Sequence, residues 1–261
     1  MTLSRRRLLL AGGSAAAVGL SGCLGLGGDA PDDPNETSGS NGTDAGGNGS
    51  ASTTTPAEVD GPIANAPVPN DPGEFTYARM GSGDLPTFTY FGNWKCPFCA
   101  RFSVDILGDL VTQYVASGRL DMEYRGLAYV NGEPFLGPDA PRATRAGLAV
   151  WAVDPERYWP YHEYVMANQP SEAREWATAD RLVEFARAAG VSDPEAVRER
   201  LDDEAFERAV EETSARASEL ELRGTPSLLV DGTVVSPFAR ESGDIVANPE
   251  MYELLDSLAE G

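Results

Sequence analysis

The stretch that decides the fold reads Phe91-Gly92-Asn93-Trp94-Lys95-Cys96-Pro97-Phe98-Cys99. It joins an apolar segment, residues 87–91, which predicts a strand, to a segment with apolar residues at helical spacing. Positions i and i+3 share one face of a helix, about 5–6 Å apart, which suits the geometry of a disulfide. Cys96 would lie at the positive end of the helix dipole, where backbone N–H groups lower the pKa of a thiol. The stretch therefore predicts a redox-active pair of cysteines.

A structural disulfide and half of a zinc site are the other interpretations of this pair. A structural zinc site needs four protein ligands, and only Cys23 and His162 remain to join the two cysteines, so we expect no metal. A bridge that closes so short a loop constrains the unfolded chain little, so a purely structural role is the weaker interpretation. Hydrolytic chemistry has no support, because no Ser/His/Asp or metal-binding pattern accompanies the pair. The aromatic surroundings of His162 in the sequence favour packing over catalysis.

The charge of the chain excludes one class of partner and indicates a source. Asp and Glu number 41 against 20 Lys and Arg, which gives a formal charge of −21, and Lys95 is the only lysine. Nucleic-acid binding is not expected, because neutralising phosphates needs a basic surface. Many carboxylates with almost no lysine are typical of proteins from a salt-saturated cytoplasm, where salt screens the charge repulsion. The composition therefore predicts a halophile, such as a haloarchaeon.

The first 23 residues predict an export signal. The segment Ser4-Arg5-Arg6-Arg7-Leu8-Leu9 has the twin-arginine pattern, and the apolar run that follows is shorter than the roughly 20 residues that span a bilayer. The run ends at Leu20-Ser21-Gly22-Cys23, which resembles the lipobox of lipoproteins. We expect a twin-arginine signal peptide with lipidation at Cys23, and hence a lipid-anchored protein on the extracytoplasmic face of the membrane. A plain signal peptide with an incidental cysteine is the alternative.

Two further regions follow the signal. Residues 24–72 are rich in Gly, Ser, Asn, Thr and Asp, which predicts a disordered tether. Residues 73–261 hold strand and helix patterns and predict one folded domain. The expected strands lie at 75–80, 86–91 and 120–130, with a helix from Cys96 to Gly118 between the last two; this is a βαβ unit. Five helices follow, the fourth with a capping box at Ser192 and Glu195. An Asp-Gly hairpin at 225–235 and a helix at 249–259 complete the chain.

A second motif gives the pair its context. Gly224-Thr225-Pro226 precedes the hairpin, and together with Cys-Pro-x-Cys at the start of a helix it resembles the DsbA-like branch of the thioredoxin superfamily. The likeness covers residues 74–261, and the helices at about 138–222 fall where DsbA-like proteins carry a helical insertion. The resemblance implies a thioredoxin-like three-layer α/β/α sandwich, with this insertion between the βαβ unit and the cis-proline strand.

The resemblance also assigns roles to four residues. Cys96 matches the exposed attacking cysteine, and Cys99 matches the buried resolving one. Pro226 matches the cis-proline that packs against the disulfide. Thr225 would then offer its backbone to an extended substrate chain, in the manner of an added β-strand.

Four sequence neighbours of the pair belong to the expected site together with Thr225. They are Pro97, Phe98, Trp94 and Lys95, which surround the two cysteines. Phe98 departs from the family, because some DsbA-type motifs have histidine there to stabilise the thiolate. Asn93 also departs, since related sequences often have Asp at that place. Lys95 can supply the missing positive charge beside Cys96.

The expected function is thiol–disulfide oxidoreductase on exported proteins, forming disulfides through the Cys96/Cys99 couple with no other cofactor. The implied partners are cysteine-containing exported proteins and a membrane thiol oxidase or reductase. Three alternatives stay open at this point: an extracytoplasmic disulfide reductase, an isomerase, and a non-catalytic lipid-anchored module that binds peptides.

Overall fold

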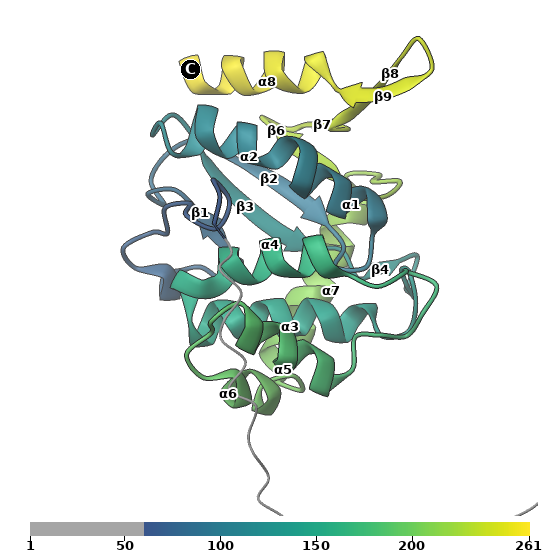
Figure 1. The fold of residues 1–261 in the computed structure, drawn as a ribbon. Coiled ribbons are helices and arrows are strands. Elements are labelled where there is room, and N and C mark those ends of the chain that lie inside the picture. Colours follow the sequence, from purple (N-terminus) through teal and green to yellow (C-terminus); the bar gives the residue numbers. More distant parts are fainter. Residues whose placement is uncertain (1–59) are drawn as a thin grey trace, which may run out of the picture. The chain divides into compact units, whose positions relative to one another are not determined.

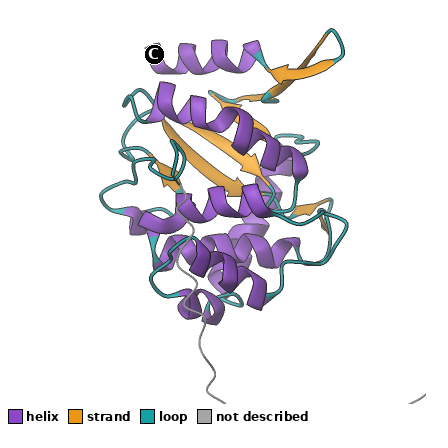
Figure 2. Ribbon diagram, in the orientation of Figure 1, coloured by secondary structure: helices purple, strands orange, loops and turns teal. Residues whose placement is uncertain are grey.

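The computed structural model describes residues 60–261, so the predicted signal peptide, Cys23 and most of the predicted tether lie outside the described residues. A five-stranded mixed sheet forms the centre, in the order β1-β3-β2-β6-β7 (Figures 1 and 2). Its strands are β1 (Arg79–Met80), β2 (Thr87–Gly92), β3 (Asp121–Gly126), β6 (Ser227–Val230) and β7 (Thr233–Val235). Strands β2 and β3 are parallel, and the other neighbours are antiparallel. The predicted βαβ unit is confirmed.

Helices cover both faces of this sheet. The helix that follows Cys96 comprises α1 (Pro97–Phe102) and α2 (Gly108–Leu110), with π-helical turns at Ser103–Leu107 and Val111–Val115. The last helix, α8 (Pro249–Glu260), lies beside it, and the Tyr114 hydroxyl donates to the Asp256 carboxylate at 3.1 Å. Helix α7 (Glu204–Glu219) is seen behind the sheet in Figure 1. These layers agree with the expected α/β/α sandwich.

The predicted helical insertion is present between the βαβ unit and β6. It comprises α3 (Ala140–Val153), α4 (Tyr158–Asn168), α5 (Ala179–Ala188), α6 (Pro194–Glu199) and α7. The cap of α6 differs from the prediction: Asp193, not Ser192, accepts from the Ala196 N–H at 3.0 Å. Ser192 instead donates its own N–H to the Asp154 carboxylate at 2.7 Å, outside the helix.

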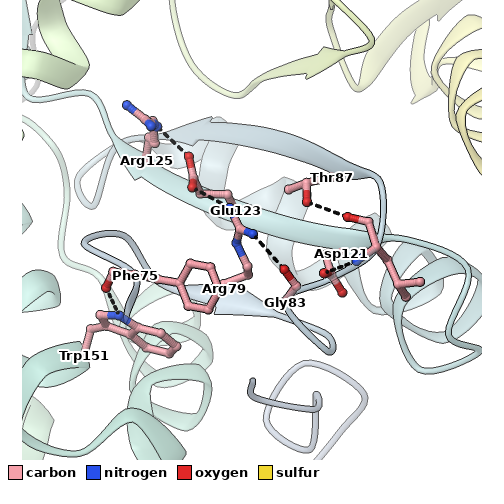
Figure 3. Close-up of polar contacts among 9 residues, drawn as sticks. Phe75, Arg79, Gly83, Thr87, Asp121, Glu123, Arg125 and Trp151 are labelled. Carbon is pink, nitrogen blue, oxygen red and sulfur yellow. Dashed lines mark hydrogen bonds and ion pairs between the residues drawn. The ribbon is translucent and has the colours of Figure 1, made fainter. Parts of the chain in front are cut away.

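The first expected strand is shorter than predicted, because its groups bond to a helix as well as to the sheet (Figure 3). The carbonyl of Phe75 accepts from the Trp151 indole of α3 at 2.9 Å, and strand pairing begins only at Arg79. The Arg79 guanidinium lies 4.3 Å from the centre of the Phe75 ring and pairs with Glu123 at 3.1 Å. The Arg79–Glu123 pair ties β1 to β3, and Glu123 also pairs with Arg125 of its own strand at 2.6 Å.

The strand expected at 120–130 is two strands. Strand β3 ends at Gly126, and the Leu127 N–H turns to the Gly92 carbonyl at 2.7 Å. Strand β4 (Tyr129–Val130) then pairs with β5 (Glu133–Pro134) in a separate hairpin. This bend places the 127–135 loop against the end of β2, where the cysteine motif begins.

The tether boundary was predicted too late in the chain. Ile63 is only 3% exposed, and the Ala64 N–H donates to the Glu163 carboxylate of α4 at 3.0 Å. The Pro67 carbonyl accepts from the Gly81 N–H at 2.8 Å. The packed part therefore includes residues from about 61, because one buried isoleucine and backbone bonds hold a segment whose composition resembles a linker.

The C-terminal region holds one expected hairpin and one unexpected hairpin. The predicted turn is confirmed, with positive φ of 44° at Asp231 and 77° at Gly232. A second hairpin, β8 (Phe238–Glu241) and β9 (Asp244–Ala247), turns at Ser242 and Gly243. No helix in the part of the chain that the structure describes is long and apolar enough to cross a membrane.

Candidate active site

The two cysteines lie at the N-terminus of α1, as the sequence predicts. Cys96 is the N-cap residue, and its Sγ accepts from the Cys99 N–H at 3.4 Å. Pro97 occupies the first helical position, where no N–H is needed. Both cysteines are present as thiols. The helix therefore aims its unpaired N–H groups at the sulfur of Cys96.

The two thiols differ in acidity. The pKa of Cys96 is lowered to about 6, chiefly by the hydrogen bond with the Cys99 thiol, while Thr225 and backbone N–H groups add to the effect and burial opposes it. Burial raises the pKa of Cys99 well above its usual value, and the neighbouring Cys96 raises it further. At pH 7 Cys96 is therefore mainly thiolate, and Cys99 stays protonated.

Both sulfurs are less accessible than the resemblance implied for the attacking cysteine. Cys96 is 4% exposed and Cys99 is fully buried. The cause is the loop before β6, because the Cys96 thiol donates to the Thr225 carbonyl at 3.3 Å. Cys99 accepts from the Asn93 N–H at 3.4 Å on its other side. Cys96 is still the more accessible of the two.

The Thr225–Pro226 loop reaches the cysteines through the sheet. Strand β6 pairs antiparallel with β2, and Ser227 lies opposite Phe91 at the end of β2. The two residues before Ser227 are thereby brought beside Cys96. The Thr225–Pro226 peptide bond is cis, as the resemblance implied.

A groove adjoins this loop. Its volume is about 260 Å³, and its lining comprises Phe98, Thr225, Pro226, Ser236, Phe238, Ala239, Arg240 and Ile245. Phe98 is 49% exposed and meets Phe238 of β8 edge to face, with 6.4 Å between the ring centres. The Arg101 guanidinium donates to the Ile245 carbonyl at 3.2 Å and holds the β8–β9 hairpin to α1. The β8–β9 hairpin was not predicted from the sequence, although Ser-Gly at 242–243 is a dipeptide that marks turns.

The Lys95 ammonium pairs with a carboxylate rather than with the Cys96 thiolate. Its side chain is 1% exposed and forms an ion pair with Asp139, which also accepts from the Ala177 N–H at 2.8 Å. Burial alone would raise the pKa of Asp139, but the hydrogen bonds from Lys95 and Ala177 outweigh burial and lower it. The charge of the only lysine is therefore paired with Asp139 at the start of the helical insertion. Lys95 does not contribute to the lowered pKa of Cys96.

Asn93 organises the same loop. Its side-chain amide donates to the Leu127 carbonyl at 2.8 Å and to the Phe135 carbonyl at 3.1 Å. Its side-chain oxygen accepts from the Lys95 N–H at 2.8 Å. Two donors and one acceptor are needed here, which explains why an amide rather than a carboxylate fits this position.

Trp94 and His162 belong to a buried aromatic cluster rather than to the groove. The Trp94 ring centre lies 5.5 Å from that of Tyr124 and 5.4 Å from that of His162. His162 is fully buried, and burial lowers its pKa to about 3, so the ring is neutral at pH 7. The expected packing of His162 against the sheet is confirmed.

Comparison with known proteins decides the family. A family model described as thioredoxin matches residues 79–244, well over half of the chain. The chain belongs to the thioredoxin family. Disulfide bond formation protein D of Bacillus subtilis (strain 168) is 32% identical to this thioredoxin-family chain over 161 residues, which are 61% of the chain and 70% of that relative. Probable disulfide bond formation protein D of Bacillus anthracis is 27% identical over 164 residues, 62% of the chain and 73% of the relative.

Solved structures of other proteins have the same fold. Oxidised BdbD from Bacillus subtilis superposes with a TM-score of 0.58 and 25% identity, covering 75% of this chain and 98% of that one. Chlamydia trachomatis DsbA has a TM-score of 0.53 and 17% identity, covers 70% and 90%, and supports the fold alone. The protein is thus a DsbA-like member with a thioredoxin fold.

Proposed function

We propose that this chain is a thiol–disulfide oxidoreductase that forms disulfides in exported proteins. The observation that carries the proposal is the pair of thiols with opposite acidity at the start of α1, beside the loop of Thr225 and Pro226. The relatives named disulfide bond formation proteins support the direction of the reaction.

The first step uses the oxidised Cys96–Cys99 disulfide. A client thiolate attacks the Sγ of Cys96, the Cys96–Cys99 bond breaks, and a client–Cys96 mixed disulfide forms. Cys99 departs as a thiolate and takes up a proton, which its high pKa favours.

The second step releases the client. A second client thiolate attacks the client sulfur of the mixed disulfide, and Cys96 departs as a thiolate. Two client thiols have then lost two electrons and two protons, and the protein holds both cysteines reduced. A thiol of low pKa leaves faster, so the pKa of about 6 at Cys96 suits this release. A membrane thiol oxidase would then restore the disulfide.

The groove beside Cys96 supplies a place for the client. Phe98, Phe238 and Ile245 offer apolar surface next to the Thr225–Pro226 loop. An extended client segment can lie along the backbone of Thr225 as a short added strand, with its cysteine at Cys96. In the reduced form Cys96 is 4% exposed beside the Thr225 carbonyl, so a client that reaches this sulfur must fit between α1 and the Thr225–Pro226 loop.

Oxidative refolding tests the direction. Oxidised protein in stoichiometric amount should convert a reduced, unfolded client of two cysteines to its disulfide form and become reduced itself. Reduced protein should not reduce a stable client disulfide at a comparable rate. The opposite pair of results would assign the chain as a reductase, and shuffling of mispaired client disulfides alone would assign an isomerase.

The location proposed for the protein is the extracytoplasmic face of the cell membrane of a halophile. Its support is the twin-arginine motif, the lipobox at Cys23 and the acidic, lysine-poor composition. Replacing Cys23 by Ala should release the exported protein from the membrane, and replacing Arg5 and Arg6 together by Lys should retain it inside the cell. Membrane retention of the Cys23→Ala protein would contradict lipid anchoring.

A further inference from the structure

Tyr90 lies on β2 and is completely buried, with its ring held by aromatic neighbours. The ring meets Phe102 of α1 at 5.0 Å and 75°, and Tyr124 of β3 at 5.0 Å and 72°. The ring of His162 of α4 is a third edge-to-face neighbour of Tyr90, with 6.3 Å between the ring centres. Three edge-to-face contacts fix the plane of the ring and therefore the place of its hydroxyl.

The Tyr90 hydroxyl and the Cys99 sulfur approach the same turn of backbone. A Cβ atom at Gly92 would lie 2.9 Å from the Tyr90 oxygen, so the missing side chain of Gly92 makes room for the hydroxyl. The next residue, Asn93, donates its N–H to Cys99 Sγ at 3.4 Å. The pKa of Tyr90 is raised well above 10, first by burial and then by the neighbouring Cys99 thiol.

This hydroxyl has no hydrogen-bond partner among residues 60–261, although it is inaccessible to solvent. A buried polar group without a partner lowers the stability of the fold, so its retention needs an explanation. A tyrosine that stays protonated can donate to a sulfur whose negative charge exists only during the reaction. Cys99 carries that charge at the moment when its bond to Cys96 breaks or forms.

We propose that the Tyr90 hydroxyl donates a hydrogen bond to the Cys99 thiolate during exchange. The inference rests on the proposed function and identifies a further residue that acts on a reacting atom. When a client thiolate attacks Cys96, the Cys96–Cys99 bond breaks, the electron pair stays on Cys99, and the Tyr90 hydroxyl stabilises the departing thiolate until it is protonated. In the reverse step Cys99 loses its proton to the solvent and attacks Cys96, and the client leaves as a thiolate that takes up a proton. The same hydrogen bond assists both directions.

The reverse step can be timed with Ellman's reagent, an aromatic disulfide that releases a coloured thiolate. Reduced protein releases a first equivalent when Cys96 attacks the reagent, and a second when Cys99 displaces the reagent from Cys96. In the Tyr90→Phe protein we expect the first release within twofold of wild type and the second about tenfold slower, the loss of one hydrogen bond to a charged group. The pH profile of the second release should move about one unit upward.

Tyr161→Phe is the matched control. Tyr161 is fully buried, its hydroxyl also lacks a partner in the described part of the chain, and burial alone raises its pKa with no contribution from either cysteine. Both release rates should equal those of wild type. The other titratable groups beside Cys99 are Cys96 and Tyr124, and they are unchanged in both variants.

Three results would overturn the inference. The second release could keep its wild-type rate and pH profile in Tyr90→Phe, both releases could slow equally, or Tyr161→Phe could show the same defect. If Tyr90→Phe fails to fold, a ring-fluorinated tyrosine at position 90 keeps the hydroxyl and strengthens it as a donor, and it should move the pH profile of the second release downward. A wild-type protein that releases no first equivalent contradicts the proposed function itself, so the two failures are distinguishable.

Discussion

The backbone N–H of Asn93 donates to the sulfur of Cys99, while the Asn93 side chain bonds to the carbonyls of two other loop residues. One residue therefore supports the resolving cysteine and joins the end of β2 to the 127–135 loop. The amide makes three side-chain hydrogen bonds while 0% exposed. The position of the backbone that leads into Cys96 therefore depends on this neutral side chain.

Replacing Asn93 by Asp should destabilise the protein. A carboxylate offers no donors, so its oxygen would face the carbonyls of Leu127 and Phe135 at the places where N–H groups now lie. We expect a loss of about 2–3 kcal/mol in the free energy of unfolding, measured by urea denaturation. Asn70→Asp, at an exposed position, is the control and should change stability by less than about 0.5 kcal/mol. Equal stabilities of the two variants would refute the role assigned to Asn93.

The rate at which iodoacetamide alkylates reduced protein should rise with pH through about 6 and then level off. The thiolate is the nucleophile, and the pKa of Cys96 is lowered to about 6, so the reactive form increases as pH rises past this value. Cys99 should remain unmodified, because it is buried and its pKa is raised. The control, Cys96→Ser, should show no modification below pH 8. An inflection above pH 8 would contradict the proposed asymmetry of the pair.

Lys95 should affect stability rather than reactivity. Replacing it by Met leaves the buried Asp139 without its charged partner, which should cost about 3–5 kcal/mol. The double variant Lys95→Met, Asp139→Asn should recover part of that loss. The pH dependence of Cys96 alkylation should stay the same in the double variant, because the Lys95 charge pairs with Asp139. A rise in the pKa of Cys96 by one unit or more in that variant would show that the lysine does serve the thiolate.

The reduction potential should lie between about −120 mV, the value for DsbA, and about −270 mV, the value for thioredoxin. The Phe98 side chain cannot donate a hydrogen bond, so stabilisation of the Cys96 thiolate is left to Cys99, Thr225 and the backbone N–H groups at the start of α1. Equilibration with glutathione buffers in molar salt measures the potential. Phe98→His should make the couple more oxidising; a potential outside the stated interval would refute the prediction.

Sequence reasoning predicted the parts of the fold that depend on local chemistry. The strand-to-helix turn at Cys96 and the Asp231-Gly232 hairpin follow from motifs with few alternatives, whereas the cis bond before Pro226 was implied by the family resemblance alone. It failed where tertiary contacts decide. Phe75 bonds to Trp151 instead of joining the sheet. The buried side chains of Ile63 and Ala66, with backbone hydrogen bonds, fix a segment that has the composition of a tether.

The site was predictable to a similar extent. The positions of Cys96, Cys99 and Pro226 could be inferred from spacing and resemblance, but the partner of Lys95 could not. Asp139 lies far along the chain, at the start of the insertion, and only the folded structure shows that the two charges meet. The groove wall at Phe238 depends in the same way on the packing of a C-terminal hairpin against α1.

The central claim is that Cys96 forms the mixed disulfide with clients and that Cys99 is its redox partner. Trapping in cells tests it most directly, because a Cys99→Ser protein cannot use Cys99 to break a mixed disulfide at Cys96. On non-reducing gels this variant should accumulate adducts with exported cysteine-containing proteins that disappear on reduction, while Cys96→Ser and the double Cys96→Ser, Cys99→Ser variant should accumulate none. The absence of adducts in Cys99→Ser, together with normal function of the double variant, would contradict the redox account and favour a module that only binds peptides.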